Sequence, residues 1–392
     1  MKALISLPIT AYLVYRSYSR SSLTPLGILF ATLTALLHAT HPSPLPFTLL
    51  IVFFLAGTTA TRLNHDVKSG YTLSSTGSSS SAGGGGGGGG GDGGGKGRTH
   101  VQVLANSGVA SALVLVHLWR VGWGVDSWRG NGEGEYVPTS GSVAGLILAG
   151  IVASYAAVAA DTFSSELGIL AKSSPRLITR PWVKVPRGTN GGVTAEGLAA
   201  GVLGALVVAM ASVLVMPFRS GGNAAGLGPV GRVLMAGEKV EVYRRWTLRD
   251  KAVWVLAVTV WGALGSVLDS LLGAVLQASV VDRRTGKIVE GVGGVKVLVS
   301  GRNGWDGMRE AVHPKQHKDE ALKKGMQADT DQDEKAASPN GRGESRRVLV
   351  GWDWLDNNQI NLLMAACMSV GGMAVASWVW GIPLSSMWTR DR

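Results

Sequence analysis

Eight apolar stretches, each close to the length of one helical membrane crossing, constrain this chain more than any other feature of its sequence. A hydrocarbon core of about 30 Å requires about 20 apolar residues per helical crossing. Inside lipid a helix satisfies its own backbone hydrogen bonds. The sequence therefore predicts an all-α, polytopic membrane helical bundle with about eight transmembrane helices. They are expected at residues 3–19, 23–40, 44–61, 101–119, 141–161, 192–217, 252–277 and 359–383.

The composition supports this fold class and limits the classes of partner. Hydrophobic residues make up 46% and charged residues 16% of the 392 residues. This composition is more apolar than that of a typical soluble protein. The single cysteine, Cys367, excludes both an intramolecular disulfide and a cysteine-based metal site. The net charge of +11 is not accompanied by interleaved aromatic and basic residues, so we expect no nucleic acid as a partner.

Two low-complexity segments divide the chain. The Ser/Gly run at 74–95 has no side chains with which to build a core, and the segment at 303–347 is rich in charged and polar residues. The expected organisation is N-terminal transmembrane helices at 1–73, a Gly/Ser insert at 74–95, a core membrane domain with polar motifs at 96–302, a disordered polar insert at 303–347, and a C-terminal transmembrane helix at 348–392. Alternating β-branched and small residues at 286–300 predict a short extramembrane β-hairpin.

The positive charges predict how the bundle is oriented. The connection at 172–187 carries five cations and no acidic residue, which is typical of a cytosolic loop. The connection at 219–251, on the other face, is also basic, so the orientation depends on the absence of acids from 172–187. We expect an integral, multi-pass protein of the endoplasmic reticulum or another endomembrane.

The motif DTFSSELG (161–168) ends the fifth apolar stretch. Polar groups at membrane depth are unfavourable unless they have a partner, a watery cavity or a function. In a continuous helix, Asp161, Ser164 or Ser165, and Gly168 share one face, and Glu166 points elsewhere. The structural alternative is that Asp161 forms an ion pair at a helix end with a nearby lysine such as Lys172.

The motif GTNGGVTAEG (188–197) follows the basic loop and opens the sixth helix. Glycines allow the backbone to approach an anion closely, and free N–H groups at a helix start favour phosphate. A capping turn is the structural alternative, although it needs fewer glycines. We predict that phosphate is bound by a set of residues in and just before this motif: Lys184, Arg187, Gly188, Thr189, Asn190, Gly191 and Gly192.

Asp269 lies well inside the seventh apolar stretch, in GSVLDSLLGAVLQ (265–277). Gly265, Asp269, Gly273 and Gln277 recur at every fourth position and form one stripe along the helix. Close helix packing explains the small residues. It does not explain a carboxylate at this depth, so we expect Asp269 to have a function.

Weaker polar clusters open the fourth and eighth helices: Gln102 with Asn106, and Asp356 with Asn357, Asn358 and Asn361. Helix capping is an equally good explanation of these residues. However, if the chain crosses the membrane eight times, all these clusters and the three motifs above meet at one face. The sequence therefore predicts one polar site at that face.

The motifs, in this order, resemble the transmembrane protein 19 family (domain of unknown function 92), which includes plant phytyl-phosphate kinase. The matching residues are GRTHVQVLANSGVA (97–110), ADTFSSELG (160–168), PRLIT (175–179), GTNGGVTAEG (188–197), GSVLDSLLGAVLQ (265–277) and LDNNQINLL (355–363). The resemblance covers the chain from about residue 20 onward, except for the two inserts. A fainter similarity, restricted to the segment around Asp161 and to Glu196 with Gly197, connects the chain with membrane prenol kinases that use CTP.

The resemblance implies a phosphoryl transfer from a CTP-like nucleoside triphosphate to a prenyl or other isoprenoid phosphate. Such chemistry needs positioning and charge neutralisation. We expect Asp161 and Asp269 to hold Mg²⁺, and Glu166 and Glu196 to complete the catalytic carboxylates. Asn106, Asn190 and Asn358 are expected to orient oxygens, with the lipid tail between helices.

A transporter or channel for an ion or small anion is the rival interpretation, because an intramembrane Asp269 and glycine-interrupted helices suit it too. The basic, glycine-rich segment at 184–192 favours a nucleotide over a cation path. A purely structural scaffold leaves Asp269 unexplained.

The predicted orientation can be tested by cysteine labelling in a Cys367→Ser background. We expect a membrane-impermeant maleimide to modify Ser174→Cys only from the cytosolic side, because the surrounding loop is basic. Modification from the lumenal side alone would overturn the topology.

Overall fold

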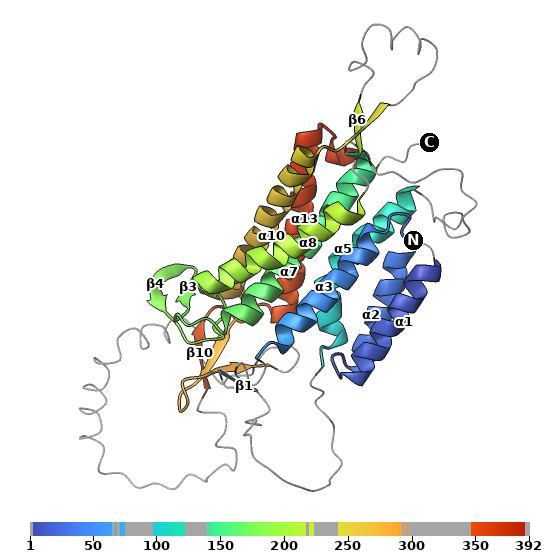
Figure 1. The fold of residues 1–392 in the computed structure, drawn as a ribbon. Helices are drawn as coiled ribbons and strands as arrows, with labels where there is room; N and C mark the ends of the chain where they lie inside the picture. The colour runs from blue at the N-terminus through green and yellow to red at the C-terminus, as the bar shows by residue number, and fades with distance from the viewer. Residues whose placement is uncertain are drawn as a thin grey trace, which may run out of the picture.

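The computed structural model describes residues 3–64, 67, 71–74, 97–121, 139–140, 142–216, 219–222, 242–291, 294, 297 and 346–388. Both predicted low-complexity inserts lie almost wholly outside these residues. The described residues form eight α-helices arranged in one bundle (Figure 1): α1 (Ala3–Ser19), α2 (Pro25–Ala39), α3 (Leu45–Arg62), α5 (His100–Val121), α7 (Val143–Gly168), α8 (Ala195–Val215), α10 (Leu248–Leu276) and α13 (Asn357–Trp380). The predicted all-α, polytopic bundle is confirmed, and each helix overlaps one predicted stretch.

Six of these helices are long and apolar enough to cross a membrane: α3, α5, α7, α8, α10 and α13. Helix α1 has 17 residues with Pro8 inside it, and α2 has 15. These two lie beside α3 and α5 at the edge of the bundle (Figure 1). A short 3₁₀ helix, Leu384–Met387, follows α13.

Helix α7 is the centre of the bundle, because every residue from 145 to 160 is buried. A helix that is apolar on all sides must be covered on all sides. Its neighbours in contact are α3, α5, α8, α10 and α13. The largest side chain buried on it is Tyr155, whose hydroxyl lies 2.8 Å from Nε2 of His38 on α2.

Small residues bring the helices of this core close together. A Cβ atom at Gly204 of α8 would lie 2.5 Å from Ala159 O, and one at Gly265 of α10 would lie 2.5 Å from Ala157 Cβ. Contacts this short leave no room for a larger side chain. Packing therefore explains Gly265 of the predicted stripe, whereas a Cβ atom at Gly273 would lie at an ordinary contact distance of 3.7 Å from Asn190 Cβ.

Polar caps fix where several helices begin. Thr24 Oγ1 accepts from Gly27 N at the start of α2, and Thr194 Oγ1 accepts from Gly197 N at the start of α8. Asp356 forms a capping box with Gln359 at the start of α13. The capping explanation of Asp356 is thus confirmed.

Three small sheets lie outside the helices. Two are at the end of the bundle where α7 and α10 finish and α5, α8 and α13 begin, hereafter the site end, which is the lower end in Figure 1. One has the order β1 (Thr72–Ser74), β9 (Ile288–Glu290), β8 (Ser279–Asp282), β10 (Arg346–Val350); the other has the order β4 (Arg180–Lys184), β3 (Arg176–Leu177), β5 (Gly192–Val193). The third, at the opposite end, contains β2 (Thr139–Ser140), β6 (Arg219–Gly222) and β7 (Val242–Arg245).

A short hairpin exists outside the helices, but it spans 279–290 and so shares only 286–290 with the predicted range of 286–300. Strands β8 and β9 pair antiparallel, with Val280 opposite Val289 and Val281 opposite Ile288. The first strand directly follows α10, so its apolar residues continue the helix pattern and hide the boundary. Most of 291–300 lies outside the described residues.

The close packing of α10 predicts a large penalty for substitution of Gly262. Its added Cβ atom would lie 2.7 Å from Ala205 Cβ and 2.8 Å from Ala156 O. We expect Gly262→Leu to lower the stability of the purified protein by about 1–3 kcal/mol or more, measured as a lower thermal midpoint in detergent. The control is Ala257→Leu on the exposed side of the same helix, which should change little. Equal midpoints for the two variants would contradict the packing.

Candidate functional site

The site end of the bundle contains a polar cavity of about 570 Å³. Its walls are formed by α3, α5, α7, α10 and α13, together with strands β8 and β9. The predicted meeting of polar clusters at one end of the bundle is therefore observed. Seven of the predicted site residues line the cavity: Asn106, Asp161, Glu166, Gly188, Asn190, Asp269 and Asn358.

Two carboxyl groups from different helices meet in this cavity. Asp161 of α7 and Asp269 of α10 both line the cavity, and their side chains lie close enough to interact with each other. Asp161 thus points toward α10, which is not the direction expected for a simple helix-end pair with Lys172. Two carboxylates at this separation repel each other unless a proton or cation lies between them.

Amide side chains surround the carboxyl pair. The amide of Asn361 on α13, oriented with its nitrogen toward α10, donates to Asp269 Oδ1 over 3.1 Å. Asn106 on α5 and Asn358 on α13 line the same cavity, and Asn358 is buried. One or two carboxylates, with water and phosphate oxygens completing the shell, are a common set of ligands for Mg²⁺.

Arg98 and Glu166 face each other across one side of the cavity. Arg98 Nη2 donates to Thr61 Oγ1 over 2.6 Å and to Gly57 O over 3.1 Å on α3. Thr61 Oγ1 also lies 2.9 Å from Glu166 Oε1. Glu166 points in a different direction from Asp161, as expected, because it contacts Thr61 of α3 whereas Asp161 faces Asp269 of α10, although both side chains line the cavity.

The position of Arg98 is fixed by its backbone. Its N–H donates to Ser22 O, and its carbonyl accepts from Thr24 N, between α1 and α2. Burial lowers the pKa of the Arg98 guanidinium, and the nearby Glu166 carboxylate opposes this shift. The positively charged guanidinium of Arg98 is therefore held partly away from water, and the Glu166 carboxylate beside it compensates for the lost hydration.

Acidic groups dominate the described lining of the cavity. Arg98 is the only lysine or arginine among those lining residues. The acidic residues among them are Asp161, Glu166, Asp269, Glu290, Asp353 and Asp356. A phosphate group would be repelled by this set unless cations accompany it.

The described residues contain no group of three or more His, Cys, Asp or Glu side chains arranged as a metal site. Any ion at Asp161 and Asp269 must therefore complete its coordination with amides, water or a ligand.

The glycine-rich turn contributes only part of itself to the cavity. Gly188 and Asn190 line it, and Asn190 is held by hydrogen bonds from its N–H to Ser279 Oγ and from its amide to Ala278 O. Gly191 has a φ of +74°, and a Cβ atom there would overlap Ala274 Cβ on α10. Thr189 is buried and donates to Pro186 O, while Gly192 pairs with Leu177. The turn is built largely for packing against α10.

Three predicted charged residues lie outside the cavity lining. Lys184 is exposed at the end of β4. Arg187 donates to Ile169 O over 2.7 Å at the end of α7, and its guanidinium stacks on Tyr71. Glu196 accepts from Ser173 Oγ over 2.7 Å. The structure thus brings the carboxyl pair and the asparagines together and leaves these three apart from them.

Arg98 and Thr61 line the cavity, although the sequence did not single them out as site residues, and Asn361 lines it as a member of the polar cluster predicted at the start of the eighth helix. For Arg98 the usable signal is its place in GRTHVQVLANSG, two turns before Asn106. Thr61 gives no such signal, because a threonine near a helix end is common.

A sequence comparison decides the family. The profile of the integral membrane protein family DUF92 matches residues 8–369. The chain belongs to this family. It is a multi-pass integral membrane protein, and the resemblance derived from its motifs is confirmed.

Two relatives illustrate the range of the DUF92-like proteins. Protein PGR of Arabidopsis thaliana is 30% identical over 301 residues, which cover 74% of this chain and 86% of the relative. An uncharacterized membrane protein of Methanocaldococcus jannaschii is 37% identical over 130 residues, which cover 33% of this chain and 40% of the relative. No solved structure matches the chain.

The carboxyl pair predicts a stabilising divalent cation. A ligand at 100 times its Kd stabilises a folded protein by about 2.7 kcal/mol, so saturating Mg²⁺ should raise the thermal midpoint of the purified wild type. Asp269→Asn should remove this rise, and without Mg²⁺ should be at least as stable, because repulsion between the carboxylates is gone. Asp250→Asn, at the other end of α10, is the matched control and should respond like wild type. An unchanged Mg²⁺ response in Asp269→Asn would refute the assignment.

Proposed function

We propose that this protein transfers a phosphoryl group from a nucleoside triphosphate, CTP-like in its class, to a prenyl or other isoprenoid monophosphate. The reaction takes place in the polar cavity at the site end. The observation that carries the proposal is the contact between Asp161 and Asp269, which places two carboxyl groups from neighbouring core helices at the head of an open, amide-lined cavity.

The donor set fits Mg²⁺ accompanying phosphates. Mg²⁺ is commonly held by one or two carboxylates, with water and substrate phosphates completing its shell. Asp161 and Asp269 would hold it, and Asn361 orients Asp269. Bound there, the ion neutralises phosphate charge, which an otherwise acidic cavity requires.

The chemistry needs little from the protein beyond position and charge. A phosphate oxygen of the lipid forms a bond to the γ-phosphorus of the nucleotide. The bond from that phosphorus to the bridging oxygen breaks, and nucleoside diphosphate leaves with the electron pair. The acceptor phosphate is already ionised near neutral pH, so no general base is needed. This agrees with carboxylates that act through charge rather than through proton transfer.

The remaining lining residues have positioning roles. Arg98 supplies a fixed positive charge on the lipid side of the cavity, and the Thr61 and Glu166 contacts hold its guanidinium in place. Asn106, Asn190 and Asn358 supply amide groups for phosphate or ribose oxygens. Lys184, Arg187 and Glu196, which lie outside the cavity, have no role in this proposal.

A cation transporter is the second candidate, and the acidic lining of the cavity favours it. That function requires a polar path from the cavity through the bundle. Directly beyond Asp161, the residues of α7 from 156 to 160 are alanine or valine and at most 2% exposed. This packed turn favours a site that is entered and left at one end.

The test is nucleotide-dependent phosphorylation of farnesyl and geranylgeranyl monophosphate by the purified protein, with CTP, ATP, GTP and UTP compared. We expect isoprenyl diphosphate from wild type and from Asp250→Asn. In Asp269→Asn the rate should fall at least a hundredfold, because the metal carboxylate is lost while the fold remains.

The outcomes separate the candidates. An active Asp269→Asn enzyme would sink the metal assignment. A wild type inactive with every nucleotide, combined with cation uptake in proteoliposomes that depends on Asp269, would favour the transporter.

A further inference from the structure

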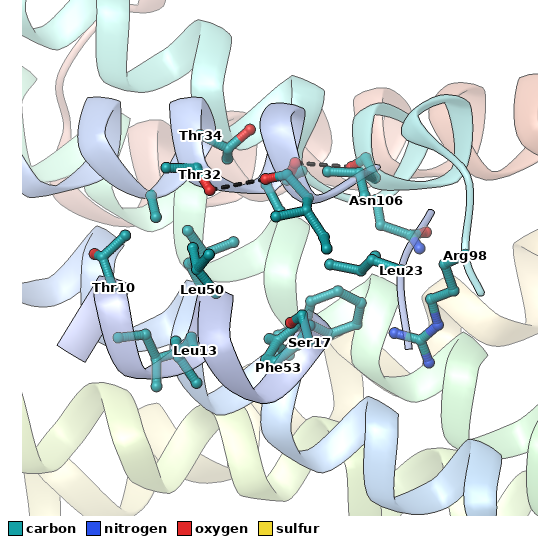
Figure 2. A pocket seen from close by; sticks show the side chains of 18 of the residues that line it. Thr10, Leu13, Ser17, Leu23, Thr32, Thr34, Leu50, Phe53, Arg98 and Asn106 are labelled. Atoms are coloured by element: carbon teal, nitrogen blue, oxygen red, sulfur yellow. Dashed lines mark hydrogen bonds between the residues drawn. The ribbon is translucent and has the colours of Figure 1, made fainter. Parts of the chain in front are cut away.

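A second, apolar pocket lies between α1, α2, α3 and α5, next to the polar cavity. Its walls include Leu13 of α1, Ala31 and Ala35 of α2, and Leu50 and Phe53 of α3. Figure 2 shows Arg98 and Asn106 at one end of this pocket, with Thr10 and Leu13 at the other. The pocket therefore runs from the site end into the depth of the bundle.

The two cavities adjoin each other at three shared residues. Arg98, Gln102 and Asn106 line both of them. Arg98 makes its backbone hydrogen bonds at the turn between α1 and α2, beside the apolar pocket, while its guanidinium reaches Thr61 in the polar cavity. A ligand that spans this junction must have a polar head and an apolar body.

The interior of the pocket suits a chain without polar groups. Three hydroxyl groups in its walls are already bonded to backbone carbonyls: Thr32 to Ile28 O, Thr34 to Phe30 O and Ser107 to Val103 O, each over 2.8 Å. Because these three hydroxyl groups already donate to backbone carbonyls, they have no hydrogen left to donate to a ligand. The buried hydroxyl of Thr10, at the deep end, has no hydrogen-bond partner among the described residues, whereas the charged and amide side chains of the pocket gather at the end with Arg98, Gln102 and Asn106.

The dimensions favour a single chain. About 80 Å³ of free space remains among the side chains of the pocket, in a crevice enclosed by four helices. This free space is smaller than one farnesyl chain, so flexible side chains such as Leu13 and Leu50 must change rotamer before one chain can enter. Two parallel acyl chains would have to separate the helices.

We propose that this pocket binds the hydrocarbon tail of a single-chain isoprenoid monophosphate whose phosphate lies beside Arg98. The proposal rests on the proposed function for the chemistry of its head group. It adds where the tail lies and which helix limits its length. Ala31 and Ala35 are one turn apart on α2, and Ala31 is nearer to the polar end.

The position of these alanines predicts a graded effect of added bulk. Ala35→Phe should block the deep part of the pocket and lower the affinity for geranylgeranyl monophosphate at least tenfold, while geranyl monophosphate binds nearly as before. Ala31→Phe should weaken both. The control Leu33→Phe, on the exposed face of the same helix, should weaken neither. A merely unfolded variant would lose both ligands equally and show a lower thermal midpoint.

The direct experiment is photolabelling of the full-length protein in phosphatidylcholine nanodiscs, with a farnesyl monophosphate that carries a diazirine on its last isoprene unit. We expect saturable adducts on α1, α2 or α3 at the pocket, displaced by farnesyl monophosphate but at least tenfold weaker for the matching diazirine alcohol. Ala35→Phe should reduce the adducts, and Leu33→Phe should not. Adducts mainly on α10 and α13, or equal labelling of the two variants, would overturn the proposal.

This labelling needs no nucleotide, so its result is independent of phosphoryl transfer. Labelling at the pocket without any kinase activity would retain the tail site and reject the proposed reaction. Kinase activity with labelling elsewhere would retain the proposed reaction and reject the tail site.

Discussion

The buried helix α7 is the constraint on which the rest of this structure depends. Its residues from 145 to 160 are enclosed on every side, and most are alanine, glycine or valine. Small residues allow the backbones of α8 and α10 to approach α7 so closely that a methyl group added at a glycine in the contact would overlap a neighbouring helix. Because the core is packed this tightly, the positions of the ends of these helices can vary little.

The tight core explains how two carboxyl groups come to meet. Asp161 follows the buried part of α7 directly, and Asp269 lies one turn beyond Gly265, which packs against Ala157. Packing of the glycine positions thus fixes the separation of the two acids before any ligand binds. Such preorganisation lets a site neutralise charge without rearrangement. The extramembrane strands then close the cavity from outside, with Ser279 of β8 holding the turn at Asn190.

Much of the fold follows from hydropathy, because a membrane requires helices of known length. The site is only partly predictable for a different reason. Asp161, Asp269 and Asn358 stand out because carboxylates and amides at membrane depth need an explanation, and the structure brings them together. Arg187 stands out equally in the sequence, yet it binds the carbonyl end of α7. Sequence position could not show which way that side chain points, nor that strand β8 begins immediately after α10.

Arg98 lies between the polar, acidic cavity and the apolar pocket, and the two together suit an amphipathic phosphate. The central proposal is that an isoprenoid monophosphate is consumed there. The most direct measurement is a profile of isoprenoid phosphates in cells that lack the protein. We predict that an isoprenyl monophosphate accumulates, and that wild type but not Asp269→Asn restores its normal level. Unchanged monophosphate levels across all chain lengths would contradict the account.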